Sequence, residues 1–126
     1  MPLLSFAGSK LHVHSFPYVI NNYMYGNSKR LLHSRVKGQG SPTNLWLHGF
    51  FGSGANFSYV SRLVRGTNYL LDLRNHGDSF HATSVSSETA ARDVLKFAER
   101  SNIEKFNLIG HSFGGRVATV AAHLAP

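Results

Sequence analysis

A short apolar segment that leads into a glycine-flanked serine constrains the fold more than any other part of this sequence. Residues 105–109 have the composition of a short buried strand, and residues 116–124 are rich in alanine and predict a helix. Between them lies the pattern Gly-x-Ser-x-Gly, centred on Ser112. Glycine two positions before and after the serine allows the strand and helix backbones to come almost into contact. The segment therefore predicts a strand, a tight turn and a helix in direct succession.

A turn of this kind has a chemical consequence for Ser112. It lifts the hydroxyl clear of the sheet and places it beside the N-terminus of the following helix, where backbone N–H groups are free. We therefore take Ser112 as the candidate catalytic nucleophile, with Gly110 and Gly114 as the glycines of the turn. The alternative interpretation is an ordinary loop in which a serine lies between glycines.

A second glycine-rich turn follows residues 43–48, which have the pattern of a short buried strand. After the turn, apolar residues recur at helical spacing and predict a helix over residues 57–65, ended by Gly66. At Gly49 the backbone can turn so that the N–H of Phe50 points at a developing oxyanion. The alternative interpretation is a simple strand-to-helix loop.

The same turn has glycines at the spacing of a phosphate-binding P-loop, at Gly49 and Gly54. Ala55 and Asn56 occupy the positions at which such a loop needs Lys and Ser or Thr. Without that lysine and hydroxyl, neither the phosphates nor a magnesium ion would be held. We exclude a P-loop on these residues. The sequence has no cysteine, and we predict neither a cofactor nor a metal site.

The order of the expected elements predicts the fold class. A strand over residues 68–73 follows the first helix, and Ser86 is a good N-cap for a second helix that ends near residue 101. Strands and helices alternate, which predicts an α/β fold with a mostly parallel sheet, helices on both faces and three αβα layers. Phe50 and Ser112 both fall at carboxyl ends of strands, where such sheets bind ligands.

A polar loop, residues 74–79, follows the strand at 68–73. It could form a wall of the active-site mouth. The interpretation that we favour is structural, with Asp and Arg side chains holding the loop by hydrogen bonds and Gly77 relieving the backbone.

Charge and apolar runs limit the expected partners. The net charge is +7, and the first acidic residue is Asp72. The basic residues before it are scattered and have no stacking-aromatic motif among them, so we expect no nucleic-acid partner. No apolar run approaches the roughly 18 residues of a membrane span, so we predict no transmembrane segment. The composition does not indicate an oligomeric state.

The N-terminus differs from the rest of the chain. Residues 1–28 lack acidic residues and contain scattered Ser, His and bulky apolar residues. This composition partly resembles an organellar transit peptide. We expect residues 1–28 to be an N-terminal extension that targets the protein to mitochondria, with a cytoplasmic location as the alternative. The catalytic domain then covers residues 29–126.

Three segments together resemble the α/β-hydrolase superfamily. They are residues 47–53 (LHGFFGS), 72–79 (DLRNHGDS) and 109–115 (IGHSFGG). The chain is similar in particular to the small serine esterases, a branch that includes bacterial acyl-ester hydrolases and a mitochondrial α/β-hydrolase domain protein. The Arg-Asn-His-Gly of the middle segment is the most specific pointer to this branch. The resemblance covers about residues 29–126.

The resemblance implies roles for individual residues. Ser112 would be the nucleophile, and the backbone N–H groups of Phe50 and Phe113 would form the oxyanion hole. The substrate would be a small-molecule carboxylic ester or thioester. Further site positions are the loop glycine Gly49 and three residues that would line the pocket, His48, Phe51 and His111.

The sequence departs from the family pattern after the serine. The family's triad runs serine, acid, histidine along the chain, yet no Asp or Glu follows Ser112, and the only later histidine is His123. We therefore expect these 126 residues to be the N-terminal part of a longer hydrolase, and to be nearly inactive alone. Two alternatives stay open, a non-catalytic binding or regulatory module and an acyltransferase that uses the same triad.

Overall fold

The computed structural model describes residues 30–125 and the backbone of residues 5–6, 9–10 and 12–15. Among these residues, the main sheet has five strands in the order β3-β7-β5-β6-β4. β5 (Thr43–Leu47), β6 (Thr67–Leu71) and β7 (Lys105–Gly110) are parallel, whereas the edge strands β3 (His12–Ser15) and β4 (Ser34–Lys37) run antiparallel to their neighbours. β1 (Ser5–Phe6) and β2 (Ser9–Lys10) form a separate pair.

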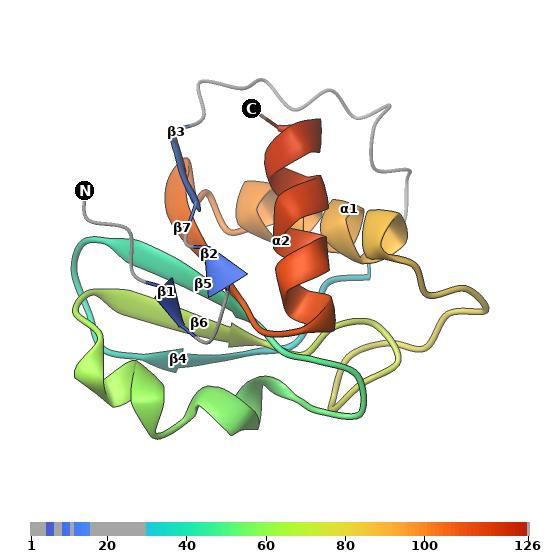
Figure 1. Cartoon of the computed structure of the whole chain (residues 1–126), viewed down its shortest axis with the longest axis horizontal. Coiled ribbons are helices and arrows are strands. Elements are labelled where there is room, and N and C mark those ends of the chain that lie inside the picture. Colours follow the sequence, from blue (N-terminus) through green and yellow to red (C-terminus); the bar gives the residue numbers. More distant parts are fainter. Residues whose placement is uncertain (1–4, 7–8, 11, 16–29, 126) are drawn as a thin grey trace.

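The sheet is covered on both faces, as Figure 1 shows. The helices α1 (Ser87–Arg100) and α2 (Phe113–Leu124) pack against each other and cover one face. Two short 3-10 helices, η1 (Gly54–Phe57) and η2 (Val60–Leu63), lie across the opposite face. The predicted α/β class and the mostly parallel sheet are confirmed.

Alternation along β5 explains how both faces become buried. Leu45 and Leu47 point toward α1 and α2 and belong to the main apolar core, in which Val94 and Val117 have no exposed surface. Trp46 points the other way, where its ring lies 5.2 Å from the ring of Phe57 in η1. A central parallel strand that is buried on both faces needs such a continuous apolar run.

The predicted helix over residues 57–65 is wrong, because that stretch contains only the last residue of η1 and then the short helix η2. The backbone N–H of Val64 bonds the carbonyl three residues earlier, that of Ser61, in the pattern of a 3-10 helix. The buried side-chain amide of Asn68 donates to the carbonyls of Ser61, Val64 and Gly66. These carbonyls are engaged by a neighbouring strand, which competes with a regular helix.

The second predicted helix is confirmed, and its start follows from Ser86. The Ser86 hydroxyl accepts the N–H of Thr89 at 3.1 Å, and the Thr89 hydroxyl accepts the N–H of Ser86 at 3.0 Å. This reciprocal pair satisfies two backbone donors at the first turn of α1. The helix ends at Arg100, with Ser101 as its C-cap, and the next residue, Asn102, has a φ of 54°.

The predicted N-terminal extension, residues 1–28, lies outside the described residues except for the backbone of β1, β2 and β3. β3 pairs antiparallel with β7 and so extends the main sheet at one edge. Within the part of the chain that the structure describes, no helix is both long enough and apolar enough to cross a bilayer.

Candidate active site

Ser112 has the backbone conformation that a sharp strand-to-helix turn requires. Its φ is 53° and its ψ is −118°, a combination that a non-glycine residue rarely adopts. A Cβ at Gly110 would lie 2.3 Å from the carbonyl oxygen of Gly114, and a Cβ at Gly114 would lie 1.9 Å from that of Leu47. Both positions therefore require glycine. The turn leaves Ser112 itself exposed at the carboxyl end of β7.

The glycine-rich loop, residues 48–53, lies directly against this turn. The N–H of His111 donates to the carbonyl of Leu47 at 3.0 Å, which joins the ends of β5 and β7. A Cβ at Gly49 would lie 3.4 Å from the Cβ of Ser112. The two segments that the sequence singled out, far apart along the chain, are therefore brought together by the parallel pairing of their strands.

Two backbone N–H groups beside Ser112 have no hydrogen-bond acceptor among the described residues, those of Phe50 and Phe113. The N–H of Phe113 is free because it belongs to the first residue of α2. The carbonyl of Gly49 accepts the N–H of Gly52 at 3.1 Å and His48 Nδ1 at 2.7 Å. Because a trans peptide is planar, the N–H of Phe50 points away from these partners.

The side chains of Phe50 and Phe113 also meet. Their rings stack with centroids 4.0 Å apart and planes 20° from parallel. Phe113 is buried, whereas Phe50 stays about half exposed. The stacked rings tie the glycine-rich loop to the first turn of α2, so the two free N–H groups are held on elements that contact each other.

His48 is a buried structural group of the glycine-rich loop. Its Nε2 accepts the N–H of Leu73 at 3.0 Å, so Nδ1 carries the proton that is donated to Gly49. Burial lowers the pKa of His48 below its ordinary value of 6.5, more than the hydrogen bond to Gly49 raises it. A neutral imidazole in a single tautomer therefore bridges the glycine-rich loop and the end of β6.

The polar loop, residues 74–79, is held by carboxylates as the favoured structural interpretation predicts. Arg74 makes a two-pronged ion pair with Asp93 at 2.6 and 2.9 Å. The buried carboxylate of Asp72 accepts the backbone N–H groups of Gly54 at 2.7 Å and of Asp78 at 3.0 Å. Gly77 has a φ of 50° and leaves no room for a Cβ beside Asp72.

The polar loop also makes a contact that the sequence analysis missed. His76 Nε2 accepts the N–H of Phe51 at 3.1 Å, and the ring of His76 lies edge-on to that of His48 with centroids 4.9 Å apart. The structural interpretation of the loop is therefore incomplete, because one of its side chains bonds the glycine-rich loop. A histidine at this position gave no signal that distinguishes such a contact from a solvent-exposed side chain.

One cluster has the residue types of a metal site. His33 Nδ1 and carboxylate oxygens of Asp72 and Asp78 lie within 4.8 Å of one another. The guanidinium of Arg35 lies 3.1 Å from Asp72 and 3.5 Å from Asp78, so a cation already balances these carboxylates. Burial alone would raise the pKa of Asp72. The hydrogen bonds from Asp78, Gly54 and His33 and the charge of Arg35 together outweigh burial, so the pKa lies below its ordinary value of 3.8. The cluster is an ion-pair network that anchors β4 to the polar loop.

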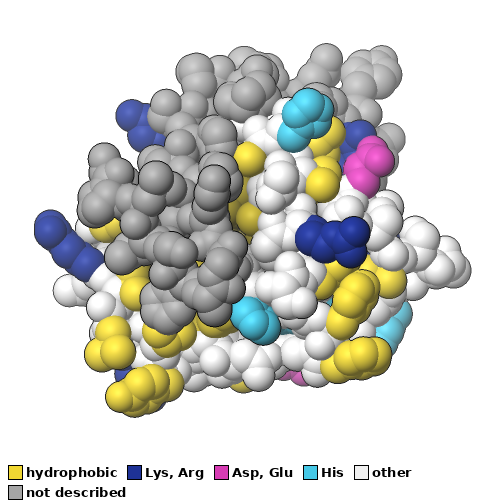
Figure 2. Space-filling view, in the orientation of Figure 1, with side chains coloured by type: hydrophobic (Ala, Val, Ile, Leu, Met, Phe, Trp, Pro, Cys, Tyr) yellow, Lys and Arg dark blue, Asp and Glu magenta, His cyan; other side chains and the backbone are white. Residues whose placement is uncertain are grey.

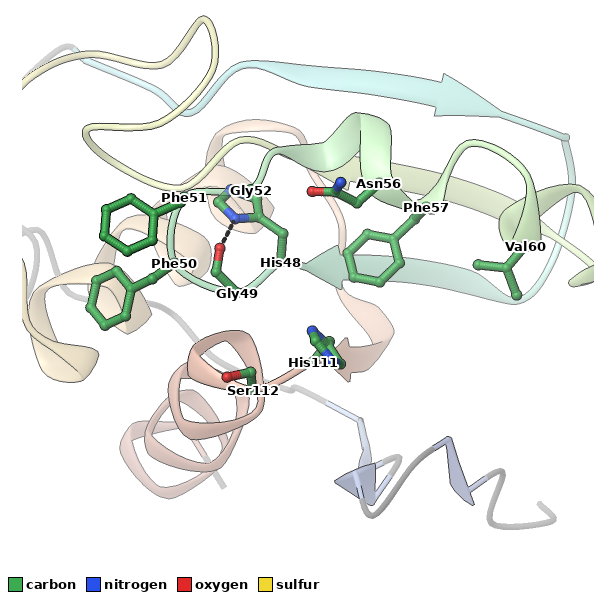
Figure 3. A pocket seen from close by; sticks show the side chains of 10 residues that line it. All are labelled: His48, Gly49, Phe50, Phe51, Gly52, Asn56, Phe57, Val60, His111 and Ser112. Atoms are coloured by element: carbon green, nitrogen blue, oxygen red, sulfur yellow. Dashed lines mark hydrogen bonds between the residues drawn. The ribbon is translucent and has the colours of Figure 1, made fainter.

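An open cavity of about 580 Å³ adjoins Ser112, and Figure 3 shows the side chains around it. The three predicted lining residues belong to it, and so do residues of η1 and η2. The lining consists of His48, Gly49, Phe50, Phe51, Gly52, Asn56, Phe57, Val60, His111 and Ser112. Figure 2 shows exposed apolar side chains at the lower right, where Figure 1 places the glycine-rich loop. The Phe51 side chain is fully exposed.

Comparison with known proteins agrees with this geometry. Residues 45–126 match the family model of the alpha/beta hydrolase fold. The chain belongs to the alpha/beta hydrolase family. The matched region begins within β5 and contains the glycine-rich loop, the polar loop and the Ser112 turn.

Relatives of this family member include both hydrolases and transferases. The sn-1-specific diacylglycerol lipase ABHD11 of Danio rerio is 39% identical over 94 residues, which are 71% of this chain and 30% of the lipase. Ethanol acetyltransferase 1 of Cyberlindnera fabianii is 32% identical over 102 residues, 78% of this chain and 30% of the transferase. The chain thus spans less than a third of either curated relative.

A solved structure agrees with the fold as well. A marine microorganism esterase superposes with a TM-score of 0.71 and is 40% identical, over 77% of this chain and 39% of the esterase. At 40% identity, the two chains share sequence as well as fold over the superposed residues.

Proposed function

We propose that Ser112 is the nucleophile of a serine hydrolase that cleaves small-molecule carboxylic esters or thioesters. The observation that carries this proposal is that an exposed serine with a φ of 53° lies beside two N–H groups, those of Phe50 and Phe113, for which the described part of the chain provides no acceptor. Free donors aimed at one position stabilise an oxyanion, which is the largest single contribution in many acyl-transfer enzymes.

In this mechanism the Ser112 oxygen attacks the acyl carbon while its proton passes to a base. The N–H groups of Phe50 and Phe113 hold the negative oxygen of the tetrahedral intermediate. The alcohol or thiol leaves with that proton, and an acyl group stays on Ser112. Water then attacks the acyl-enzyme, which releases the acid and restores the serine.

The base is a separate part of the proposal. Among the described residues, no imidazole or carboxylate bonds the Ser112 hydroxyl, and His48 and His76 are both engaged with the backbone. His123 lies in the last turn of α2, about 16 Å along the helix from Ser112. We propose that the triad's histidine and acid come from the further length that the relatives have, and that residues 1–126 alone are nearly inactive.

A second candidate function is acyl transfer to an alcohol. The similarity to ethanol acetyltransferase 1 favours it. The chemistry differs only in the last step, where an alcohol instead of water takes the acyl group from Ser112. A non-catalytic binding module is the remaining alternative, and it requires that the Ser112 hydroxyl is never activated.

The test is hydrolysis of p-nitrophenyl acetate and butyrate by the whole protein. We expect turnover that Ser112→Ala lowers by at least about a thousandfold, while Ser87→Ala on the surface of α1 leaves it unchanged. Added ethanol distinguishes the two enzymes, because a transferase converts most of the acyl group into the ethyl ester. Equal rates in the wild type and Ser112→Ala would contradict both.

We further propose that residues 1–28 direct the protein to mitochondria, a proposal that rests on their acid-free composition. A fluorescent protein fused after residue 28 should then collect in mitochondria. The control is the same fluorescent protein without residues 1–28, which should stay in the cytoplasm. Cytoplasmic fluorescence from both proteins would contradict the targeting role.

A further inference from the structure

The glycine-rich loop is tied to the polar loop through a single imidazole. The backbone N–H of Phe51 donates a hydrogen bond to His76 Nε2, with 3.1 Å between the two nitrogen atoms. An imidazole that accepts at Nε2 and stays neutral carries its proton on Nδ1, and His76 Nδ1 lies 2.8 Å from the carbonyl of Arg74. Both ring nitrogens are thus used by the backbone, one on each loop.

The conformation of Phe51 needs an external support. Its φ of 63° is unfavourable for a bulky residue. Packing does not provide the support, because its side chain is fully exposed. Within the described part of the chain, this stretch of backbone is held by the tight turn from the Gly49 carbonyl to the Gly52 N–H and by the bond to His76.

The peptide groups on both sides of Phe50 are therefore held by imidazoles. The Gly49 carbonyl accepts from His48, and the Phe51 N–H donates to His76, while the two rings contact each other edge-on. Peptide planarity leaves rotation about two bonds of Phe50 as the only freedom between them. The Phe50 N–H shares the first plane with the Gly49 carbonyl, and holding the second plane through Phe51 resists rotation of the first. The two bonds together therefore keep the direction of the Phe50 N–H, which the proposed mechanism aims at the oxyanion.

We propose that His76 is a positioning residue that fixes the direction of the Phe50 N–H through its bond to Phe51. This inference rests on the proposed function of Ser112. A misdirected donor weakens the bond to an oxygen that becomes negative only in the transition state. Losing the His76 acceptor should therefore lower kcat and leave KM nearly unchanged.

Two substitutions of His76 separate positioning from packing. His76→Phe keeps an aromatic ring against Phe50 and His48 but has no acceptor, whereas the side-chain oxygen of His76→Gln can accept the Phe51 N–H. In the whole protein, we expect kcat for p-nitrophenyl acetate to fall at least about tenfold in His76→Phe, with KM within about twofold, and to recover largely in His76→Gln. His81→Phe, in the exposed loop that follows, is the matched control.

Other outcomes of these assays overturn the proposal. An unchanged kcat in His76→Phe would show that the loop needs no acceptor. Equal losses in His76→Phe and His76→Gln, or a rise in KM alone, would show that His76 acts only through packing or substrate binding.

A measurement on the unsubstituted whole protein does not depend on any variant folding. Amide hydrogen exchange, followed residue by residue by NMR, should show the Phe51 N–H protected at least about tenfold, although its side chain is fully exposed. Exchange of Phe51 at the rate of an unstructured amide would overturn the positioning role. This result is independent of the proposed function, which fails instead if the wild-type whole protein does not turn over esters.

Discussion

At Ser112 three constraints act on one residue. The backbone has a φ of 53°, the flanking glycines leave no room for a side chain, and the hydroxyl stays exposed. A non-glycine residue in such a region costs about 1–3 kcal/mol, and it persists only when the surrounding structure determines it. Here the N-terminus of α2 and the end of β5 determine it, since a Cβ at Gly114 would collide with Leu47.

The buried His48 predicts how stability depends on pH. Burial lowers its pKa below the ordinary value of 6.5, so in the acidic range the unfolded chain binds a proton that the folded chain does not. The free energy of unfolding should be at its full value above pH 6.5 and should fall as the pH drops below it. Asp72 acts in a separate window, because its stabilising contribution is lost only below its ordinary value of 3.8.

Urea unfolding between pH 7.5 and pH 5 measures this dependence. The wild type should lose about 1.4 kcal/mol for each pKa unit by which His48 is lowered, down to the folded pKa. His48→Gln should flatten part of that slope, and His123→Gln, at an exposed position on α2, should not. A wild-type stability that is constant from pH 7.5 to 5 would show that His48 can be protonated without cost.

At the scale of elements, the sequence predicted the parallel strands, α1, α2 and the turn at Ser112. Those predictions rest on local patterns, such as the alanine-rich stretch of α2 and the cap at Ser86. The stretch at 57–65 was predicted wrongly because its carbonyls bond Asn68, a residue of the next strand. A helical periodicity contains no information about such a competitor.

A buried row of asparagines was also missed. The side chain of Asn107 in β7 donates to Asn44 in β5 at 2.7 Å, and Asn44 donates to Asn68 in β6 at 3.0 Å. Each of these three strands carries one asparagine among apolar residues, and this pattern could have indicated the row from the sequence. The row joins three parallel strands in one register, because a slip by one residue would leave buried amides without partners.

The close contact between α2 and β5 predicts that Gly114→Ala destabilises the protein, whereas helix propensity alone predicts the opposite. Alanine has a higher helix propensity than glycine, by up to about 1 kcal/mol, so propensity alone predicts that Gly114→Ala stabilises α2. A Cβ at that position would lie 1.9 Å from the Leu47 carbonyl oxygen, so we expect a loss of at least about 2 kcal/mol in the free energy of unfolding.

Chemical denaturation of Gly114→Ala beside Arg116→Ala tests this. Arg116 is exposed on the same helix, and its substitution should change stability by less than about 0.5 kcal/mol. If Gly114→Ala proved as stable as the wild type, the backbones of α2 and β5 would have to be further apart than described.

For the whole molecule, the parallel sheet is what creates the candidate site. It brings Phe50 and Ser112 to one edge from distant parts of the chain, and the alternation of strands and helices was enough to predict that meeting. The link from His76 to Phe51 was not predictable, because it depends on how two loops fold above the sheet. The proposed division at residue 28 stays a prediction.

The length of the relatives bears on chemistry at the same scale. The chain spans less than a third of the lipase and the acetyltransferase described above. Among the described residues, no imidazole or carboxylate bonds the Ser112 hydroxyl. A serine without a base is a weak nucleophile. We therefore propose that this chain supplies the nucleophile and the oxyanion donors, and that the rest of the whole protein activates the serine.

Covalent labelling tests the central claim, that Ser112 is an activated nucleophile, most directly. The whole protein is treated with a fluorophosphonate, digested with trypsin and analysed by mass spectrometry. We expect one adduct, on the peptide that contains Ser112, and its loss in Ser112→Ala but not in Ser87→Ala. If the folded protein took up no label, or took it up at another residue, Ser112 would not be an activated nucleophile.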